Sequence, residues 1–246
     1  MVNREELKNY CNTYLDIYKF KDYCPNGLQI EGSLNITKIV SGVSANLELI
    51  ERAIEEKADA IFVHHGVFWD NESKTISGAK RAQIALLLKH NINLFGFHLP
   101  LDDHYEVGNN VELGRRLGIK NMEPVAGSLL WQGELNTNIS DFSKLIEEKL
   151  DRAPQVFGKQ SGKIKKISWC TGAAQGFIED AINLNVDLYL SGEVSEKTPA
   201  VAKENNITFI SAGHHATERY GVQALCKHLC SQFKLQHHYI EVDNSV

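Results

Sequence analysis

The sequence contains an internal repeat, and this feature restricts its possible folds more than any other. Residues 38–66 align with residues 166–194 at a constant offset of 128, and the alignment needs no gap. The identical pairs include Lys38/Lys166, Ile39/Ile167, Ile50/Ile178, Glu51/Glu179, Ala53/Ala181, Ile54/Ile182 and Asp59/Asp187. Chance seldom matches polar and apolar positions together in one register, so we expect two copies of one structural unit.

Each copy has the pattern of a βαβ unit. A short β-branched run at 38–40 or 166–169 is typical of a buried strand, and an amphipathic helix follows it in both copies. A second apolar strand, at 60–63 or 188–190, closes the unit. Such a unit implies parallel strands joined by a right-handed crossover.

The same alternation continues beyond the two repeats. We expect further helices at 79–90, 195–205 and 217–233, and further strands at 91–98 and 207–213. The predicted fold is therefore α/β, with two similar halves at 1–126 and 127–246 and a less periodic region, 125–162, that links or caps them. Open α/β sheets bind ligands outside the carboxyl ends of their strands, so we expect a metal site in the cleft between the halves.

The histidines gather where predicted strands end. The chain has 10 of them, and the predicted metal ligands among these and nearby carboxylates are His64, His65, Asp102, His214 and Glu218. A lone histidine at a strand end is more often a capping or core residue. Two His-His pairs, each at a strand end, argue against that interpretation here, because loops at strand ends commonly carry functional groups.

The two halves also share a ligand pattern. At an offset of 116, His98 aligns with His214 and Asp102 aligns with Glu218, so HxxxD in one half corresponds to HxxxE in the other. The change from 128 to 116 leaves 12 extra residues in the first half, which we assign to the loop 67–78. Each half then offers an imidazole and a carboxylate, an arrangement that suits a pair of metal ions.

The predicted centre holds two divalent ions. Neighbouring residues that leave a strand point to different sides, so His64 and His65 more easily serve separate ions, with Glu218 or Asp102 as a bridge. Nitrogen and oxygen ligands suit Zn, Mn, Fe, Co or Ni, and the sequence does not choose among these metals.

Two further residues are candidates for catalysis. His98 ends a predicted strand, and Glu193 aligns with His65 in the repeat, where it is either an acid/base or a solvated or helix-capping glutamate.

The segment TGAAQG at 171–176 is either a tight turn or a phosphate-binding loop, and its counterpart SGVSAN favours the turn. Pro25, Asn26 and Gly27 form a strong turn signal.

Charge and cysteine content exclude several classes of protein. The net charge of −5 gives no global basic field for nucleic acid or anionic membranes, although Lys163, Lys165 and Lys166 form either a small basic patch or a solvated edge. No apolar run is long enough to span a membrane, and the first residues do not form a signal peptide. The five cysteines form no CxxC pair and are odd in number, which predicts a reducing, cytoplasmic location.

Several uncommon motifs occur together in this chain. They are DYCPNGLQIEG, DAIFVHHGVFW, GFHLPLDDH, WCTGAAQGFI, SGEVSE and AGHHATERYG. From about residue 22 onward the chain resembles the GTP cyclohydrolase 1 type 2 homologues, also called the NGG-interacting-factor-like family, and it is most similar to the short bacterial members. The resemblance implies two α/β halves, a dinuclear metal centre and a ring-shaped homohexamer. It also implies the metal ligands His64, His65, Asp102, His214 and Glu218.

Two functions are compatible with these features. The first is a metal-dependent hydrolase that acts on a nucleotide or a related small molecule, such as GTP or a damaged nucleotide. The second is a metal carrier, insertion factor or regulatory protein, which uses the same ligands without catalytic turnover. A ring that encircles nucleic acid has little support, because the chain is acidic and lacks an aromatic-basic stripe.

Overall fold

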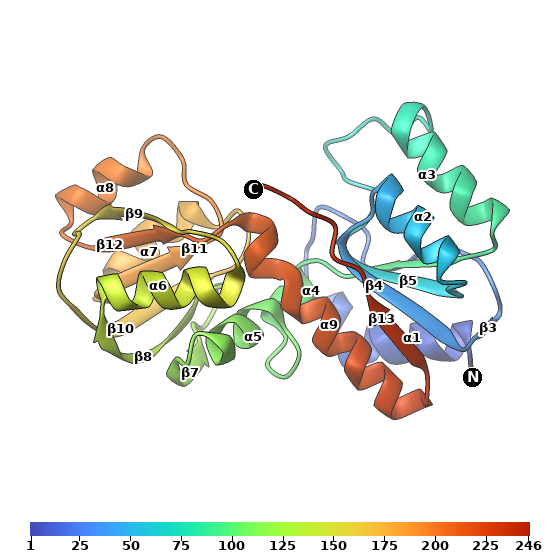
Figure 1. The fold of residues 1–246 in the computed structure, drawn as a ribbon, viewed down its shortest axis with the longest axis horizontal. Helices are drawn as coiled ribbons and strands as arrows, with labels where there is room; N and C mark the ends of the chain where they lie inside the picture. The colour runs from blue at the N-terminus through green and yellow to red at the C-terminus, as the bar shows by residue number, and fades with distance from the viewer. The chain divides into compact units, whose positions relative to one another are not determined.

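Two β-sheets carry the two copies of the repeat in the computed structural model, which describes residues 1–246 (Figure 1). The chain divides into two units. Unit 1 consists of Met1–Gly108 and Gly221–Asp243, and unit 2 consists of Asn109–Tyr220 and Asn244–Val246. These bounds differ from the predicted boundary at 126/127, because the chain leaves unit 1 earlier and returns to it through its last long helix.

Unit 1 is built around a five-stranded sheet with the strand order β13-β4-β5-β6-β2. The strands of this sheet are β2 (Gly27–Ile30), β4 (Lys38–Ser44), β5 (Ala60–His65), β6 (Asn93–Gly96) and β13 (Gln236–Tyr239). Unit 1 has two more strands, β1 (Val2–Asn3) and β3 (Asn35–Ile36), which form a separate antiparallel pair. Its helices are α1 (Arg4–Tyr14), η1 (Ile17–Lys19), α2 (Leu47–Glu55), α3 (Gly78–Lys89) and α4 (Leu99–Asp103). Strands β13, β4, β5 and β6 are parallel, and β2 is antiparallel at one edge.

Unit 2 is built around a six-stranded sheet with the order β7-β8-β10-β11-β12-β9. Its strands are β7 (Lys120–Pro124), β8 (Trp131–Asn138), β9 (Gln155–Gly158), β10 (Lys163–Cys170), β11 (Leu188–Ser191) and β12 (Thr208–Ser211). Its helices are α5 (Asn109–Arg116), α6 (Ile139–Leu150), η2 (Gln175–Phe177), α7 (Ile178–Asn183), α8 (Thr198–Glu204) and the start of α9 (His214–Phe233). The region 125–162, predicted to link or cap the halves, supplies two strands to this sheet.

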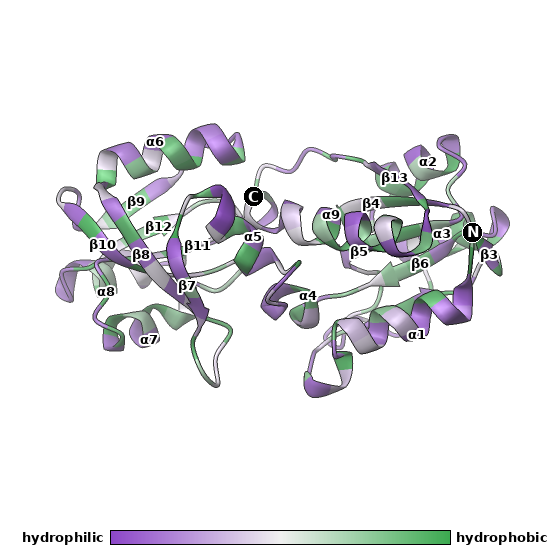
Figure 2. Cartoon of the chain, turned by 90° about the horizontal axis from the view of Figure 1, so that it is seen from below, coloured by the Kyte–Doolittle hydropathy of each residue, from purple (hydrophilic) through white to green (hydrophobic).

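Both central sheets are covered by helices on both faces. In unit 1, Ile39 and Phe62 pack with α1 and α9, whereas Val40 and Ile61 pack with α2 and α3. Unit 2 follows the same rule, because Trp169 packs with α6, whereas Cys170 packs with α7 and α8. Adjacent strand residues point to opposite faces, so strands buried on both sides are continuously apolar. Helices α1 and α6 are amphipathic, and Figure 2 shows hydrophilic and hydrophobic residues alternating along both.

The predicted βαβ repeat is present in both units. Strands β4 and β5 pair in parallel around α2, and β10 and β11 pair in parallel around α7. The chain is thus α/β with two similar units, as the sequence predicts. The predicted closing helix, 217–233, begins three residues early, at His214, so His214 lies in the first turn of α9 rather than in a loop.

Backbone hydrogen bonds refine the predicted alignment of β6 in unit 1 with β12 in unit 2. The Phe97 amide donates to Val63 O over 3.0 Å, and the Ala212 amide donates to Ser191 O over 2.8 Å. Since Val63 and Ser191 are 128 residues apart, Phe97 corresponds to Ala212 at an offset of 115. The predicted offset of 116 is therefore one residue too long at the strand ends, and His98 and His214 do not occupy identical backbone positions.

Candidate metal centre

His64 is held in one orientation by the backbone of the neighbouring strand. Its Nδ1 lies 2.9 Å from the Phe97 carbonyl oxygen, which can only accept, so Nδ1 is the donor. Its Nε2 lies 3.5 Å from Oδ1 of Asp102 on α4. In the neutral imidazole, Nε2 is an acceptor, so two buried acceptor atoms face each other. A cation between them satisfies both, and these two predicted ligands therefore fit a metal ion.

His65 follows His64 at the end of β5 and has a different partner. Its Nδ1 lies 3.0 Å from Ser44 Oγ on the adjacent strand β4. The two imidazole rings are 4.6 Å apart between centroids, with an angle of 47° between their planes. Partners on one ring nitrogen fix the direction of the other, which is the arrangement usual for metal-binding histidines.

His98 also belongs to this cluster. It precedes α4, and its ligand-capable nitrogen lies within 4.8 Å of those of His64 and His65. Its Nδ1 donates to Asp22 Oδ1 over 2.9 Å, and its backbone amide donates to Asn26 Oδ1 over 2.7 Å. The sequence predicts His98 as a catalytic residue, and its position also makes it a candidate ligand.

Asp22 is the anchor of His98. Burial raises the pKa of Asp22, but hydrogen bonds from His98 and Asn26 outweigh burial and lower the pKa to about 2. The carboxylate is therefore ionised at neutral pH and accepts the Nδ1 proton of His98. Cys24 lies beside this pair and is buried, and burial raises the pKa of its thiol well above the usual range. Its Sγ and the ligand atoms of Asp22 and His98 lie within 4.8 Å of one another.

Unit 2 contributes a second histidine–carboxylate pair. Nε2 of His214 lies 3.1 Å from Glu218 Oε2, one helical turn further along α9, and Nδ1 lies 2.6 Å from Glu193 Oε1. Burial lowers the pKa of His214, but the two carboxylates outweigh burial and raise the pKa to about 9. A metal ion at Nε2 would take the place of a proton there, since a ligating imidazole must be neutral.

Glu193 therefore has a clear structural partner. Its carboxylate fixes the His214 ring from the side opposite Glu218, which is the role of the carboxylate in carboxylate–histidine–metal arrangements. The predicted acid/base role of Glu193 stays a prediction, and its position favours orientation of His214.

Two glycines make room for the residues of unit 2. A Cβ on Gly172 would lie 2.1 Å from Glu218 Oε1, and Gly172 has a φ of +68°, which favours glycine. A Cβ on Gly192 would lie 2.7 Å from the Cα of His214. The Gly172 amide donates to Thr217 Oγ1 over 3.0 Å. The TGAAQG segment is thus a turn beside a carboxylate, which repels phosphate, and the turn interpretation is favoured.

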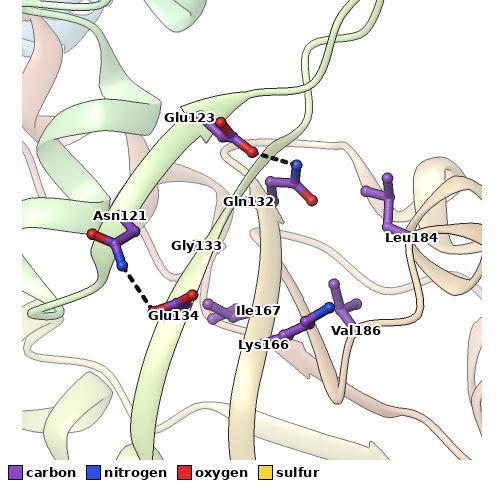
Figure 3. Close-up of a pocket in the computed structure, with 9 residues that line it drawn as sticks. All are labelled: Asn121, Glu123, Gln132, Gly133, Glu134, Lys166, Ile167, Leu184 and Val186. Carbon is purple, nitrogen blue, oxygen red and sulfur yellow. Dashed lines mark hydrogen bonds between the residues drawn. The ribbon is translucent and has the colours of Figure 1, made fainter.

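Three lysines and a pocket in unit 2 lie away from the candidate ligands. Lys163, Lys165 and Lys166 are exposed on β10, as the solvated-edge interpretation expects. A pocket of about 300 Å³ is lined by Asn121, Glu123, Gln132, Gly133, Glu134, Lys166, Ile167, Leu184 and Val186 (Figure 3). Gln132 donates to Glu123, and Asn121 donates to Glu134, each over 2.8 Å. This pocket contains none of the predicted ligands.

The structure brings the predicted site residues together within each unit. His64, His65, His98 and Asp102 gather in unit 1, and Glu193, His214 and Glu218 gather in unit 2. Sequence reasoning missed Asp22, Asn26 and Ser44, which orient the histidines. The DYCPNGLQ motif contains two of them, but its Pro-Asn-Gly signal indicates only a turn. None of the helices has the length and apolar character needed to cross a bilayer.

The chain is similar to curated bacterial proteins along its whole length. A GTP cyclohydrolase 1 type 2 homolog from Allochromatium vinosum is 48% identical over 248 residues, which cover 99% of this chain and 98% of the relative. A protein of the same name from Pseudomonas aeruginosa is 46% identical, and the match covers 97% of this chain and 96% of the relative.

Solved structures and a family model agree with these relatives. The structure of protein ybgI, of unknown function, has a TM-score of 0.94 and 40% identity, with 100% of both chains covered. The crystal structure of TTHA1606 from Thermus thermophilus has a TM-score of 0.91 and 30% identity, again with 100% of both chains covered. The model of the Duf34/NIF3 (NGG1p interacting factor 3) family matches residues 2–245. This chain therefore belongs to the Duf34/NIF3 family.

Proposed function

We propose that the protein is a metal-dependent hydrolase that acts on a nucleotide or a related small molecule. Its metal ligands are His64, His65 and Asp102 from unit 1, together with His214 and Glu218 from unit 2. The observation that carries the proposal is the pairing of an oriented imidazole with a carboxylate in each unit, at 3.5 Å for His64 and Asp102 and at 3.1 Å for His214 and Glu218. Five nitrogen and oxygen ligands suffice for about two divalent ions when one carboxylate bridges them.

The chemistry divides between the metal and the chain. Divalent cations bound there would supply Lewis acidity toward a carbonyl, phosphoryl or ring-carbon centre. The chain's own residues hold the protons in place. Asp22 keeps a proton on Nδ1 of His98, so Nε2 of His98, which lies 3.5 Å from the Tyr23 hydroxyl, is the nitrogen that can accept a proton from a reacting group.

The substrate class rests on the relatives and not on the pocket of unit 2. Curated relatives at 48% and 46% identity carry the name GTP cyclohydrolase 1 type 2 homolog. A purine nucleotide or its damaged form offers both a ring carbon and phosphoryl groups for hydrolysis.

Metal analysis and turnover test this proposal together. Protein purified without chelator should contain about two divalent ions per chain by elemental analysis. Release of formate, phosphate or base should then be followed over a panel of normal and oxidised nucleotides. Repeated turnover that stops on chelation is the expected result. A content of one ion that added Zn, Mn or Fe does not raise would contradict the dinuclear centre.

A metal carrier or insertion factor is the alternative function, and the position of Glu193 is equally compatible with it. Glu193, the predicted acid/base of unit 2, is engaged with His214 and therefore serves metal binding as readily as catalysis. No turnover on any nucleotide, with both ions verified in place, would select this alternative. Rapid transfer of the ions to an apo-acceptor protein would support it.

The Glu193→Gln variant distinguishes the two roles of Glu193. If Glu193 orients His214, metal affinity should fall by about 10- to 100-fold, as for other outer-sphere partners of ligands. If Glu193 moves a proton, turnover should fall by about 10²- to 10⁴-fold while the ions stay bound. Exposed Glu196→Gln is a matched control that should change neither quantity.

We also propose that the chain assembles into a homohexameric ring in the cytoplasm. The resemblance to the family supports the ring, and closed symmetric assemblies are the common form of oligomers. The five cysteines form no disulfide, which supports a reducing compartment. Light scattering should give about six times the chain mass of 27.6 kDa. A mass near that of one chain would contradict the ring, and cell fractionation would test the location.

A further inference from the structure

An aromatic cluster lies beside the candidate ligands of unit 1. Trp69 follows β5 in the loop that connects β5 to α3. Its ring centroid is 5.7 Å from that of His65, 5.3 Å from that of His98 and 5.9 Å from that of Tyr23. The Tyr23 ring also contacts His98, at 4.9 Å.

The two large aromatic side chains keep much of their surface in solvent. Tyr23 is 50% exposed, and Trp69 is only partly buried. Full burial of such side chains is favourable, so their exposure next to polar ligands is not explained by core packing.

The cluster is held in place by a network of hydrogen bonds. The Asp70 amide donates to Tyr23 O over 2.9 Å, which ties the Trp69 loop to the segment that precedes β2. The Val67 amide donates to Gln29 Oε1 over 2.9 Å, and Gln29 Nε2 donates to Pro25 O over 2.8 Å. The two aromatic residues therefore sit on two segments that are fixed to each other.

Gln29 is packed tightly where these segments meet. A Cβ on Gly66 would lie 2.1 Å from Gln29 Oε1, and a Cβ on Gly96 would lie 2.7 Å from Gln29 Nε2. Glycines at these two positions let the Gln29 amide sit against the ends of β5 and β6. A rigid aromatic surface loses little entropy when it binds a flat ligand.

We propose that Tyr23 and Trp69 form a stacking subsite for the planar heteroaromatic ring of the substrate. The ring is of the nucleobase class, and this identity rests on the proposed function. Aromatic side chains stack on any base because every base has a π-face. The subsite lies beside His65 and His98, so a ring bound there would have its reacting groups next to candidate ligands. The subsite belongs to unit 1, because the matching connection in unit 2, residues 192–197 between β11 and α8, is shorter and contains no aromatic residue.

Tryptophan fluorescence reports on this subsite directly. The chain has three tryptophans, and Trp131 and Trp169 are only 3% and 0% exposed. Quenching of the emission by a ring stacked at the surface must therefore come from Trp69. Zn²⁺-loaded protein is the suitable sample, because Zn²⁺ is not redox-active.

The test compares guanosine 5′-monophosphate with ribose 5-phosphate, which lacks the base. Guanosine 5′-monophosphate should quench the emission and bind more tightly than ribose 5-phosphate in calorimetry. Trp69→Ala and Tyr23→Ala should each weaken its binding by about tenfold, the loss typical of one stacking partner. Trp69→Phe should abolish the quenching while keeping most of the affinity. Binding of ribose 5-phosphate should not change in any variant.

Matched controls separate the subsite from general effects on the fold and from turnover. Tyr18 is 83% exposed, so Tyr18→Ala should bind both probes like the parent protein. Equal affinity for the two probes, binding of neither, or an unchanged affinity in Trp69→Ala would overturn the subsite. Loss of Zn²⁺ from both Trp69→Ala and Trp69→Phe would also overturn it, since the residue would then be structural. Ring-dependent binding without any turnover would retain the subsite and reject the hydrolase.

Discussion

Units 1 and 2 share a structural feature that fixes the start of their first repeat strand. In unit 1, Asp59 Oδ2 accepts from the amides of Thr37 and Lys38 over 2.7 and 2.9 Å. In unit 2, Asp187 Oδ2 accepts from the amides of Lys165 and Lys166 over 2.8 and 3.0 Å. All three positions are related by the offset of 128. The repeated aspartate thus has a structural reason, because its carboxylate accepts from two adjacent backbone amides in each unit.

The opposite ends of the same strands differ between the units. At the positions of His64 and His65 in unit 1, unit 2 has Gly192 and Glu193. Unit 1 places the imidazoles of His64 and His65 directly on β5. Unit 2 places a glycine there, and the space admits His214 from α9, with Glu193 as its partner. The comparison teaches that the strand starts hold the common scaffold while the strand ends carry chemistry that differs in each copy.

The largest expected effect tests whether unit 2 supplies a shared ligand. Glu218→Gln should reduce the metal content from about two ions per chain to less than one, because a neutral amide is a poor bridge between cations. His98→Gln in unit 1 should retain most of the metal. Elemental analysis of both variants measures the difference. A greater loss in His98→Gln would show that the unit 1 cluster, and not Glu218, dominates binding.

A smaller effect should follow from filling the space beside Glu218. In Gly172→Ala, the new methyl group meets the Glu218 carboxylate at a backbone position with positive φ. We expect metal affinity to fall by about tenfold and stability by about 1–2 kcal/mol. Gly176→Ala is the matched control, because a Cβ there meets nothing within 4 Å. Titration with Zn²⁺ and thermal unfolding would measure both quantities. Equal behaviour of the two variants would contradict the role of Gly172.

The shared aspartates allow a direct comparison of the two scaffolds. Asp59 is half-buried and also accepts from Thr37 Oγ1 over 2.7 Å, whereas Asp187 is exposed and lacks this third bond. Asp59→Ala should therefore lower the free energy of unfolding by about 2 kcal/mol, and Asp187→Ala by about 1 kcal/mol. Chemical denaturation followed by circular dichroism would measure both. The reverse order would contradict the extra stabilisation assigned to the burial of Asp59 and its hydrogen bond from Thr37.

The smallest effect concerns a histidine found only in unit 1. His237 on β13 lies 2.7 Å from Ser41 Oγ, and burial, together with the charges of Lys227 and His238, lowers its pKa from 6.5 to about 4. The unfolded chain therefore binds a proton at a higher pH than the folded chain does. The contribution of the neutral His237 to the free energy of unfolding should be fully present above pH 6.5. The free energy of unfolding should fall as the pH drops toward 4, by about 1 kcal/mol after allowance for the partial exposure of His237.

Acid titration of the unfolding free energy tests the role of His237. His237→Gln should flatten the dependence between pH 6.5 and 4, while exposed His90→Gln should leave it unchanged. An unchanged slope in His237→Gln would assign the acid sensitivity to another group.

Much of the fold followed from local patterns. The gapless repeat predicted two βαβ units, and both are present because strand and helix periodicities are written into short segments. The boundaries were less accurate. The helix α9 begins at His214 and not at 217. Residues 214–216 (HHA) form its first turn, directly after Gly213, which has a positive φ of 98°. Strand pairing also moved the offset of the later strands from 116 to 115.

The sequence by itself determined the chemistry of the candidate ligands and the strands that they lie on or follow along the chain. Residue type and local periodicity are sufficient for that. Only the tertiary structure decided which distant groups orient them. Asp22 reaches His98 across 76 residues, and Gly172 admits Glu218 across 46 residues. Such partners are selected by the order of strands in a sheet and by the path of the crossovers, and side-chain periodicity carries no record of either.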